Sequence, residues 1–189
     1  MAARLMAAGL ALTAAGMAKA APPPVPPPVE QHTADCAHPV FATDQLVCAD
    51  PALRTLDARL GTLLASASPP ESRWVEPQWQ WFQRRSRCAF SADHKGCVEA
   101  AYRERLALFE PPPRVEERRA IKCEGADMTA VAVQNGQIIL FGPFGEVWGL
   151  AWSDPSAKVW TPFLTALRRG REVSLHTIEG VSSRCRIER

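Results

Sequence analysis

The sequence predicts an α+β fold in two modules: a disulfide-stapled three-helix N-terminal module, followed by a small antiparallel β module with one short helix. Three observations support this prediction. Leucines recur at three- and four-residue spacing between residues 53 and 64, as on one face of an amphipathic helix. The pair Asn135-Gly136 lies between two apolar runs, which favours a β-hairpin. Residues 111–113 are consecutive prolines between the two patterns, and such runs commonly separate domains.

The chain begins with an expected signal peptide. Residues 1–20 have a basic start and an apolar run, and residues 18–20, Ala-Lys-Ala, form a small-x-small cleavage pattern. The apolar run is too short for a permanent anchor. We therefore expect a periplasmic or secreted protein with no stable membrane insertion after cleavage. Residues 21–33 are rich in proline and are expected to form an extended tether.

Residues 34–110 form the predicted helical module. Asp50 and Pro51 favour a helix start, with the carboxylate as N-cap and proline at the first helical position. The leucine stripe continues this first helix until a Ser/Pro-rich segment ends it. A second helix is expected over residues 77–88 and a third over residues 97–109. Three short helices give a small core, of a size that often needs covalent staples.

Residues 111–119 form the expected linker, and residues 120–189 the β-rich module. The segments MTAVAVQ before the Asn-Gly pair and QIILFG after it form the predicted hairpin. The segment TPFLTALRRG predicts a short helix, with Thr161 as N-cap, Pro162 at the first position and Gly170 beyond the end. Further strands are expected over residues 146–152, 172–178 and 182–187.

Six cysteines are disulfide candidates, because an exported protein matures in an oxidising compartment. Six cysteines allow 15 connectivities, and the sequence alone does not choose among them. We favour local pairs, since each joins neighbouring elements and stabilises by about 3 kcal/mol or more. A crossed pairing within the helical module is the alternative. The favoured pairs are Cys36 with Cys48, Cys88 with Cys97, and Cys123 with Cys185.

Charge and motifs argue against several functions. Loss of the two basic residues in positions 1–20 reduces the 22 basic residues to 20, equal to the 20 acidic residues. A neutral protein is not expected to bind nucleic acid. No phosphate-binding loop, nucleophile elbow or zinc-protease motif occurs. The four histidines lack metal-ligand spacing, so we expect no metal, no cofactor, no catalytic residues and no enzymatic activity.

The stretch QWQWFQRRSRC, residues 78–88, mixes aromatics and arginines on one expected helix. At 100° per residue, Trp81 and Cys88 share a face that the disulfide directs inward. Arg85 lies at the edge of this face and needs a carboxylate partner. We expect Asp57 to be that partner, with Glu99 as the second candidate.

Trp79 points in another direction. It lies about 160° from Trp81 around the same helix, so the two indoles do not share one small core. Trp79 therefore either packs against the second module or is exposed. An exposed tryptophan is a candidate anchor for a protein partner.

The first module contains four cysteines with aromatic and charged residues at characteristic spacing. These positions are Asp35-Cys36, Cys48-Ala49-Asp50-Pro51, Leu53, Leu56-Asp57, Gln78, Trp81-Phe82, Arg85, Cys88, Cys97-Val98, Tyr102 and Arg105-Leu106. The pattern resembles the N-terminal domain of LprI-type lysozyme inhibitors. The resemblance implies a secreted helical module that inhibits a lysozyme, with a lysozyme as the protein partner. It also implies structural roles for Trp81, Arg85, Asp57 and Tyr102.

In the second module, Cys123 lies near the start and Cys185 near the end. This arrangement more weakly resembles the MliC-type inhibitors of c-type lysozyme, small β domains with a cysteine near each end. The segment SDPSAK is nearest to the inhibitory loop of that family. The resemblance thus implies partner-binding roles for Ser156 and Lys158.

Two functions remain for comparison with the structure. The first is a secreted, non-enzymatic lysozyme inhibitor-like protein that protects the cell wall. The alternative is an adaptor or scaffold of the cell envelope whose partner is unknown. The lysozyme-inhibitor resemblance favours the first, and the proline-rich tether and Trp79 favour the second.

Overall fold

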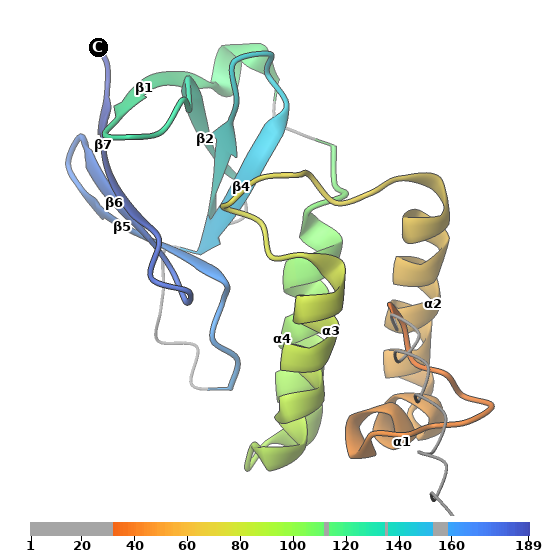
Figure 1. The fold of residues 1–189 in the computed structure, drawn as a ribbon. Helices are drawn as coiled ribbons and strands as arrows, with labels where there is room; N and C mark the ends of the chain where they lie inside the picture. Colours follow the sequence, from red (N-terminus) through yellow and green to blue (C-terminus); the bar gives the residue numbers. More distant parts are fainter. Residues whose placement is uncertain (1–31, 112–113, 135, 153–158) are drawn as a thin grey trace, which may run out of the picture.

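The computed structural model describes residues 32–111, 114–134, 136–152 and 159–189. Four α-helices lie beside a closed barrel of seven strands, and α3 and α4 are the helices that face the barrel (Figure 1). The described residues also contain two short 3-10 helices, labelled η1 and η2. The helices are α1 (Ala42–Ala49), α2 (Pro51–Ser66), α3 (Gln78–Ser86), η1 (Arg87–Phe90), α4 (His94–Ala107) and η2 (Val115–Glu117).

The seven strands form a barrel in which neighbours along the chain are neighbours in the sheet. Strand β1 pairs with both β2 and β7, which closes the barrel. All pairs are antiparallel except β4 and β5, which meet in parallel at Trp152 and Thr165. The strands are β1 (Arg119–Cys123), β2 (Ala130–Gln134), β3 (Gln137–Phe141), β4 (Val147–Trp152), β5 (Leu164–Arg169), β6 (Glu172–Thr177) and β7 (Ser182–Ile187).

The predicted fold class is therefore wrong: the described chain has four α-helices and a closed barrel, not a three-helix module with a small antiparallel β module. The segment expected as a short helix forms β5. It pairs with β6 along its whole length, from Leu164 opposite Thr177 to Arg169 opposite Glu172. Leu164 is buried while Thr165 is not, as the alternation of a strand requires. Gly170, at φ +62°, belongs to the β5–β6 turn and not to a helix cap.

The helix absent from the prediction is α1. It has only eight residues, and its N-cap, Phe41, forms no side-chain capping bond. Short helices are marginal alone, so packing and the disulfide from Cys36 to Cys48 hold α1 in place. By contrast, α2 begins as predicted, with the Asp50 carboxylate accepting from the backbone N–H groups of Ala52 and Leu53.

The disulfides join Cys36 to Cys48, Cys88 to Cys97, and Cys123 to Cys185, the pairing favoured from the sequence. Cys123 and Cys185 lie directly opposite each other in the β1–β7 pair, so this bond fastens the closing seam of the barrel. None of the helices in the described part of the chain is both long and apolar enough to cross a bilayer.

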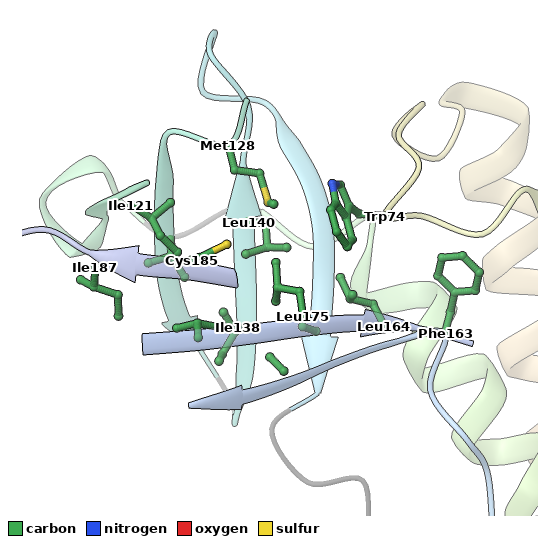
Figure 2. Close-up of a cluster of buried hydrophobic side chains, with 14 residues drawn as sticks. Trp74, Ile121, Met128, Ile138, Leu140, Phe163, Leu164, Leu175, Cys185 and Ile187 are labelled. Carbon is green, nitrogen blue, oxygen red and sulfur yellow. The ribbon is translucent and has the colours of Figure 1, made fainter. Parts of the chain in front are cut away.

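Two tryptophans connect the helices with the barrel. Trp74 lies between α2 and α3 in sequence, yet it packs in the barrel core (Figure 2). Trp160, just before β5, packs in the core of the helices. Gly149 of β4 makes room for Trp74, since a Cβ at this glycine would lie 3.0 Å from the Trp74 Cβ. The two cores thus each contain a side chain from the other part.

Candidate functional site

The end of the helices around η1 carries exposed apolar side chains. Val40 is 71% exposed, Phe41 40% and Phe90 91%. We call these three residues the apolar tip. They lie in two disulfide-closed loops, residues 36–48 and 88–97, and α1 packs against η1 at this end of the helices (Figure 1). Exposed aromatic groups at one end of a rigid element are typical anchors for a protein partner.

Contacts of the first loop with α3 and with the second loop hold the apolar tip in shape. The Thr43 hydroxyl donates to the backbone carbonyl of Ser86 at 3.0 Å and lies 3.1 Å from Nε2 of His94. Phe41 packs edge-on against Phe82, with ring centroids 6.2 Å apart. These contacts and the disulfides fix the loops before a partner arrives, which lowers the entropy cost of binding.

A buried ionic network lies beneath the apolar tip and involves all four helices. Arg85 of α3 donates to the Asp44 carboxylate of α1 and to the hydroxyl oxygen of Tyr102 of α4. The Tyr102 hydroxyl donates in turn to Asp57 of α2 at 2.7 Å, and Asp57 also accepts from the backbone N–H of Ala34 at 3.1 Å. Each helix therefore contributes one side chain to a single connected group.

Burial shifts the acidities within this network. Desolvation raises the pKa of Asp44 above its usual value, and the neighbouring Arg85 acts in the opposite direction. Desolvation also raises the pKa of Tyr102, so its hydroxyl keeps its proton and continues to donate. The network is thus a rigid, structural base for the apolar tip and not a source of reactive groups.

The expected partner of Arg85 changes in the structure. Asp57 lies 4.0 Å from the Arg85 guanidinium, while Asp44 is the carboxylate that binds it directly. Glu99, the second candidate, lies 3.5 Å from Arg103 instead. Asp44 could not be identified as this partner from the sequence, because its position depends on helix α1, which the pattern did not predict.

The other predicted structural and binding residues fall in different places. Trp81 is buried, its indole N–H donates to the Ala101 carbonyl at 3.3 Å, and its ring packs edge-on against Tyr102. Trp79 is 42% exposed on α3. Ser156 and Lys158 lie outside the described residues, so their expected role stays a prediction.

The described residues can be compared with the requirements of a metal site and of a ligand cavity. They contain no group of three or more His, Cys, Asp or Glu side chains that could hold a metal ion. A cavity of about 710 Å³ lies over β1, β6 and β7 and is lined mainly by charged residues and the Cys123–Cys185 bond. The apolar tip offers no nucleophile or general base, so what it can do is contact another protein.

Three proteins, each named lipoprotein LprI, are similar to this chain: one from Mycobacterium bovis and two from strains of Mycobacterium tuberculosis. Each is 31% identical over 105 residues, which cover 53% of this chain and 53% of the relative. The chain thus spans about half the length of the curated relatives that it matches. No family model matches the chain. The similarity supports an LprI-like relationship, and the likeness to MliC-type inhibitors stays a prediction.

Proposed function

We propose that this protein is a non-enzymatic, lysozyme inhibitor-like binding protein of the periplasm or the extracellular space, which protects the cell wall. The observation that carries the proposal is the LprI similarity over half of the chain. Three disulfides are compatible with an extracytoplasmic location.

The apolar tip supplies the contact surface in this proposal. Burial of a large aromatic side chain in a partner's cleft is favourable by about 1.5–3 kcal/mol. Phe90 and Phe41 are presented from loops that the disulfides already restrict, so little ordering is needed on binding. In this proposal, the apolar tip enters the concave cleft of the lysozyme.

Lysis of a cell-wall suspension by c-type and other lysozymes tests this function. The purified mature protein should slow lysis by at least one lysozyme class. Phe90→Ser should weaken inhibition about tenfold or more, as expected for a central aromatic anchor. Phe144→Ser is the matched control, because Phe144 is 94% exposed on the β3–β4 turn of the barrel. No inhibition of any lysozyme by the protein at tens of micromolar would exclude the function. Equal effects of the Phe90 and Phe144 variants would exclude the apolar tip as the contact surface.

An adaptor of the cell envelope is the second candidate function, favoured by the exposure of Trp79. In that case, crosslinking and pull-down from the envelope should recover one stoichiometric partner, and Trp79→Ala should weaken its recovery. A protein that recovers no specific partner and inhibits a lysozyme through Phe90 would rule this candidate out.

A further inference from the structure

The cavity of about 710 Å³ over β1, β6 and β7 is a second concave surface of the molecule. Strands β6 and β7 lie on the side of the barrel away from the helices, so the cavity is separate from the apolar tip (Figure 1). Its volume is within the range of small-molecule sites. We call it the basic cavity, because five of its side chains are cationic and three are acidic. Its charged residues are Lys122, Glu124, Arg171, Glu172, Arg184, Arg186, Glu188 and Arg189.

The register of the barrel places two cations of this cavity directly opposite each other. Lys122 of β1 is the partner of Arg186 of β7. The next residues inward, Ile121 and Ile187, belong to the barrel core, so Lys122 and Arg186 both point outward. Side chains at opposite positions have Cβ atoms about 4.5–5.5 Å apart, and like charges there are destabilising.

The repulsion between these two cations is not balanced within the described part of the chain. Neither side chain forms an ion pair or a hydrogen bond there. Glu172 of β6 lies opposite Arg186 on its other side, yet it forms no ion pair with Arg186 among the described residues. An anion bound between Lys122 and Arg186 would remove the repulsion, so this arrangement is itself an indication of a ligand.

A third cation of the cavity is already held in place. The Nε of Arg171 donates to the backbone carbonyl of Ile187 at 3.0 Å, and the Arg171 side chain is half-buried. The bond positions the guanidinium beside β7, and its terminal N–H groups have no acceptor among the described residues. Arg184 differs, because it lies 3.6 Å from Glu124. Three cations of one cavity therefore lack a carboxylate partner in the described chain.

These groups select the chemistry of the ligand. Guanidinium groups bind phosphate oxygens in a fork geometry, and a lysine adds a compact positive charge. A phosphate ester carries up to two negative charges, so it balances several cations better than one carboxylate does. The Glu172 carboxylate opposes a bare anion, but it accepts hydrogen bonds from the hydroxyl groups of a polyol. We propose that the basic cavity binds a polyol phosphate, of which glycerol phosphate is the simplest.

Titration of the ¹⁵N-labelled mature protein with glycerol 3-phosphate tests this site by NMR. The amide signals of Lys122, Arg171 and Arg186 should shift together at concentrations up to about 10 mM. Lys122→Gln and Arg186→Gln should each weaken binding about tenfold, because each removes a charged hydrogen-bond donor. The control Arg59→Gln removes one positive charge from the exposed side of α2 and should leave the affinity unchanged.

Thermal unfolding of Arg186→Gln separates loss of the site from loss of the fold. In low-salt buffer without phosphate, its midpoint should equal or exceed that of the wild type, because the variant removes the repulsion with Lys122. A clearly lower midpoint would show that Arg186 is held by attractive contacts, and it would overturn the argument.

Parallel titrations with inorganic phosphate and with succinate test the ligand chemistry. Glycerol 3-phosphate should bind more tightly than inorganic phosphate, and Glu172→Gln should remove this advantage. Equal affinity for either of the two simpler anions would overturn the proposal.

Vesicle flotation distinguishes the two sources of a glycerol phosphate group. Binding to vesicles that contain phosphatidylglycerol, but not to vesicles of phosphatidylcholine alone, would assign the group to a lipid headgroup. Binding of glycerol 3-phosphate without vesicle binding would assign it to a soluble ligand, and the absence of both would overturn the proposal. The site is separable from lysozyme inhibition, because Phe90→Ser should leave phosphate binding intact and Arg186→Gln should leave inhibition intact.

Discussion

At the scale of the residue, the stability of the helices depends most on Arg85. Its guanidinium is fully buried and its direct anionic partner is Asp44. Asp44→Ala would leave a buried charge without its partner, and this typically costs about 3–5 kcal/mol. We expect the free energy of unfolding, measured with guanidinium chloride, to fall by that amount. The control is Asp35→Ala, which removes an exposed carboxylate next to the Cys36–Cys48 disulfide and should change stability little. Equal losses in the two variants would contradict this role for Asp44.

Gly149 gives a second test at this scale, because it leaves space for Trp74. A Cβ at this position would lie 3.0 Å from the Trp74 Cβ and 3.1 Å from Cδ2 of Leu164. Gly149→Ala should therefore destabilise the protein by about 1–3 kcal/mol through overpacking. Gly61→Ala is the matched control on α2, where a Cβ meets only Thr33 at 3.7 Å. That variant should stabilise by about 0.5–1 kcal/mol, and thermal unfolding of both variants should give shifts of opposite sign.

Single residues also show how far the sequence could predict the site. Helical phase was enough to direct Arg85 and Trp81 inward, since only the spacing of residues along one helix was needed. Asp44 could not be found in this way, because its contact with Arg85 joins positions 41 residues apart. Phe90 gave no signal either. Phe90 is the last residue of η1, a four-residue 3-10 turn that contains Cys88, and so short an element has no apolar period of its own.

At the scale of the element, local signals and long-range pairing disagreed most in β5. Thr161, Pro162 and Gly170 have the order of a helix start and stop, and no local feature contradicts it. The segment becomes a strand because β6 offers a complete ladder of hydrogen bonds and the barrel core accepts Leu164 and Ala166. The β2–β3 hairpin was predicted correctly, because an Asn-Gly pair between two apolar segments is a local signal for a tight turn.

The short element η1 should depend on its disulfide. Cys88 lies in η1 and Cys97 in α4, at a sequence separation of nine. Replacing both cysteines by alanine should lower the free energy of unfolding by about 3 kcal/mol. It should also weaken lysozyme inhibition, because Phe90 would no longer be held in one place. Urea unfolding and the lysis assay measure the two effects. The Cys36→Ala/Cys48→Ala variant is the comparison. If the variant without Cys88 and Cys97 loses stability but still inhibits fully, η1 is not part of the binding surface.

At the scale of the whole molecule, the exchange of tryptophans makes the helices and the barrel mutually dependent. We infer that residues 34–110 and 120–189 are two structural units that unfold together. Trp160→Ala should lower stability by about 3–5 kcal/mol, because it removes a large side chain from the helical core. Hydrogen exchange should then show reduced protection of amides in α3, α4 and the barrel strands alike. Reduced protection of the helical amides alone would show that the two units unfold separately.

The boundary between the two units also determines how stability responds to pH. Glu104 of α4 accepts hydrogen bonds from the Trp160 indole and from the Phe163 backbone N–H at 2.8 Å. It also lies 3.5 Å from Arg84, whose guanidinium packs on the Trp160 ring. Desolvation nevertheless raises the pKa of Glu104 above its usual value of 4.5. Burial likewise raises the pKa of Asp44.

A carboxyl group with a raised pKa binds its proton more tightly in the folded state than in the unfolded state. Its contribution to stability is therefore complete below its unfolded pKa and is lost as the pH rises through its folded pKa. We expect the free energy of unfolding to increase when the pH is lowered from 7 toward the ordinary carboxyl range. The pKa values of Asp35 and Asp50 are lowered instead. These two groups therefore lose their contribution to stability only when the pH falls below about 4.

Glu104→Gln should remove a large part of this gain on acidification, because the buried group no longer titrates. Urea unfolding of the wild type and of the variant at a series of pH values between 7 and 4.5 measures the difference. Asp44→Asn should remove a further part, and Glu99→Gln, on the same helix but not buried, should leave the gain unchanged. The opposite result is a wild-type stability that falls steadily as the pH is lowered from 7 to 4.5. It would show that the neighbours of Glu104 favour its charged form more than burial disfavours it.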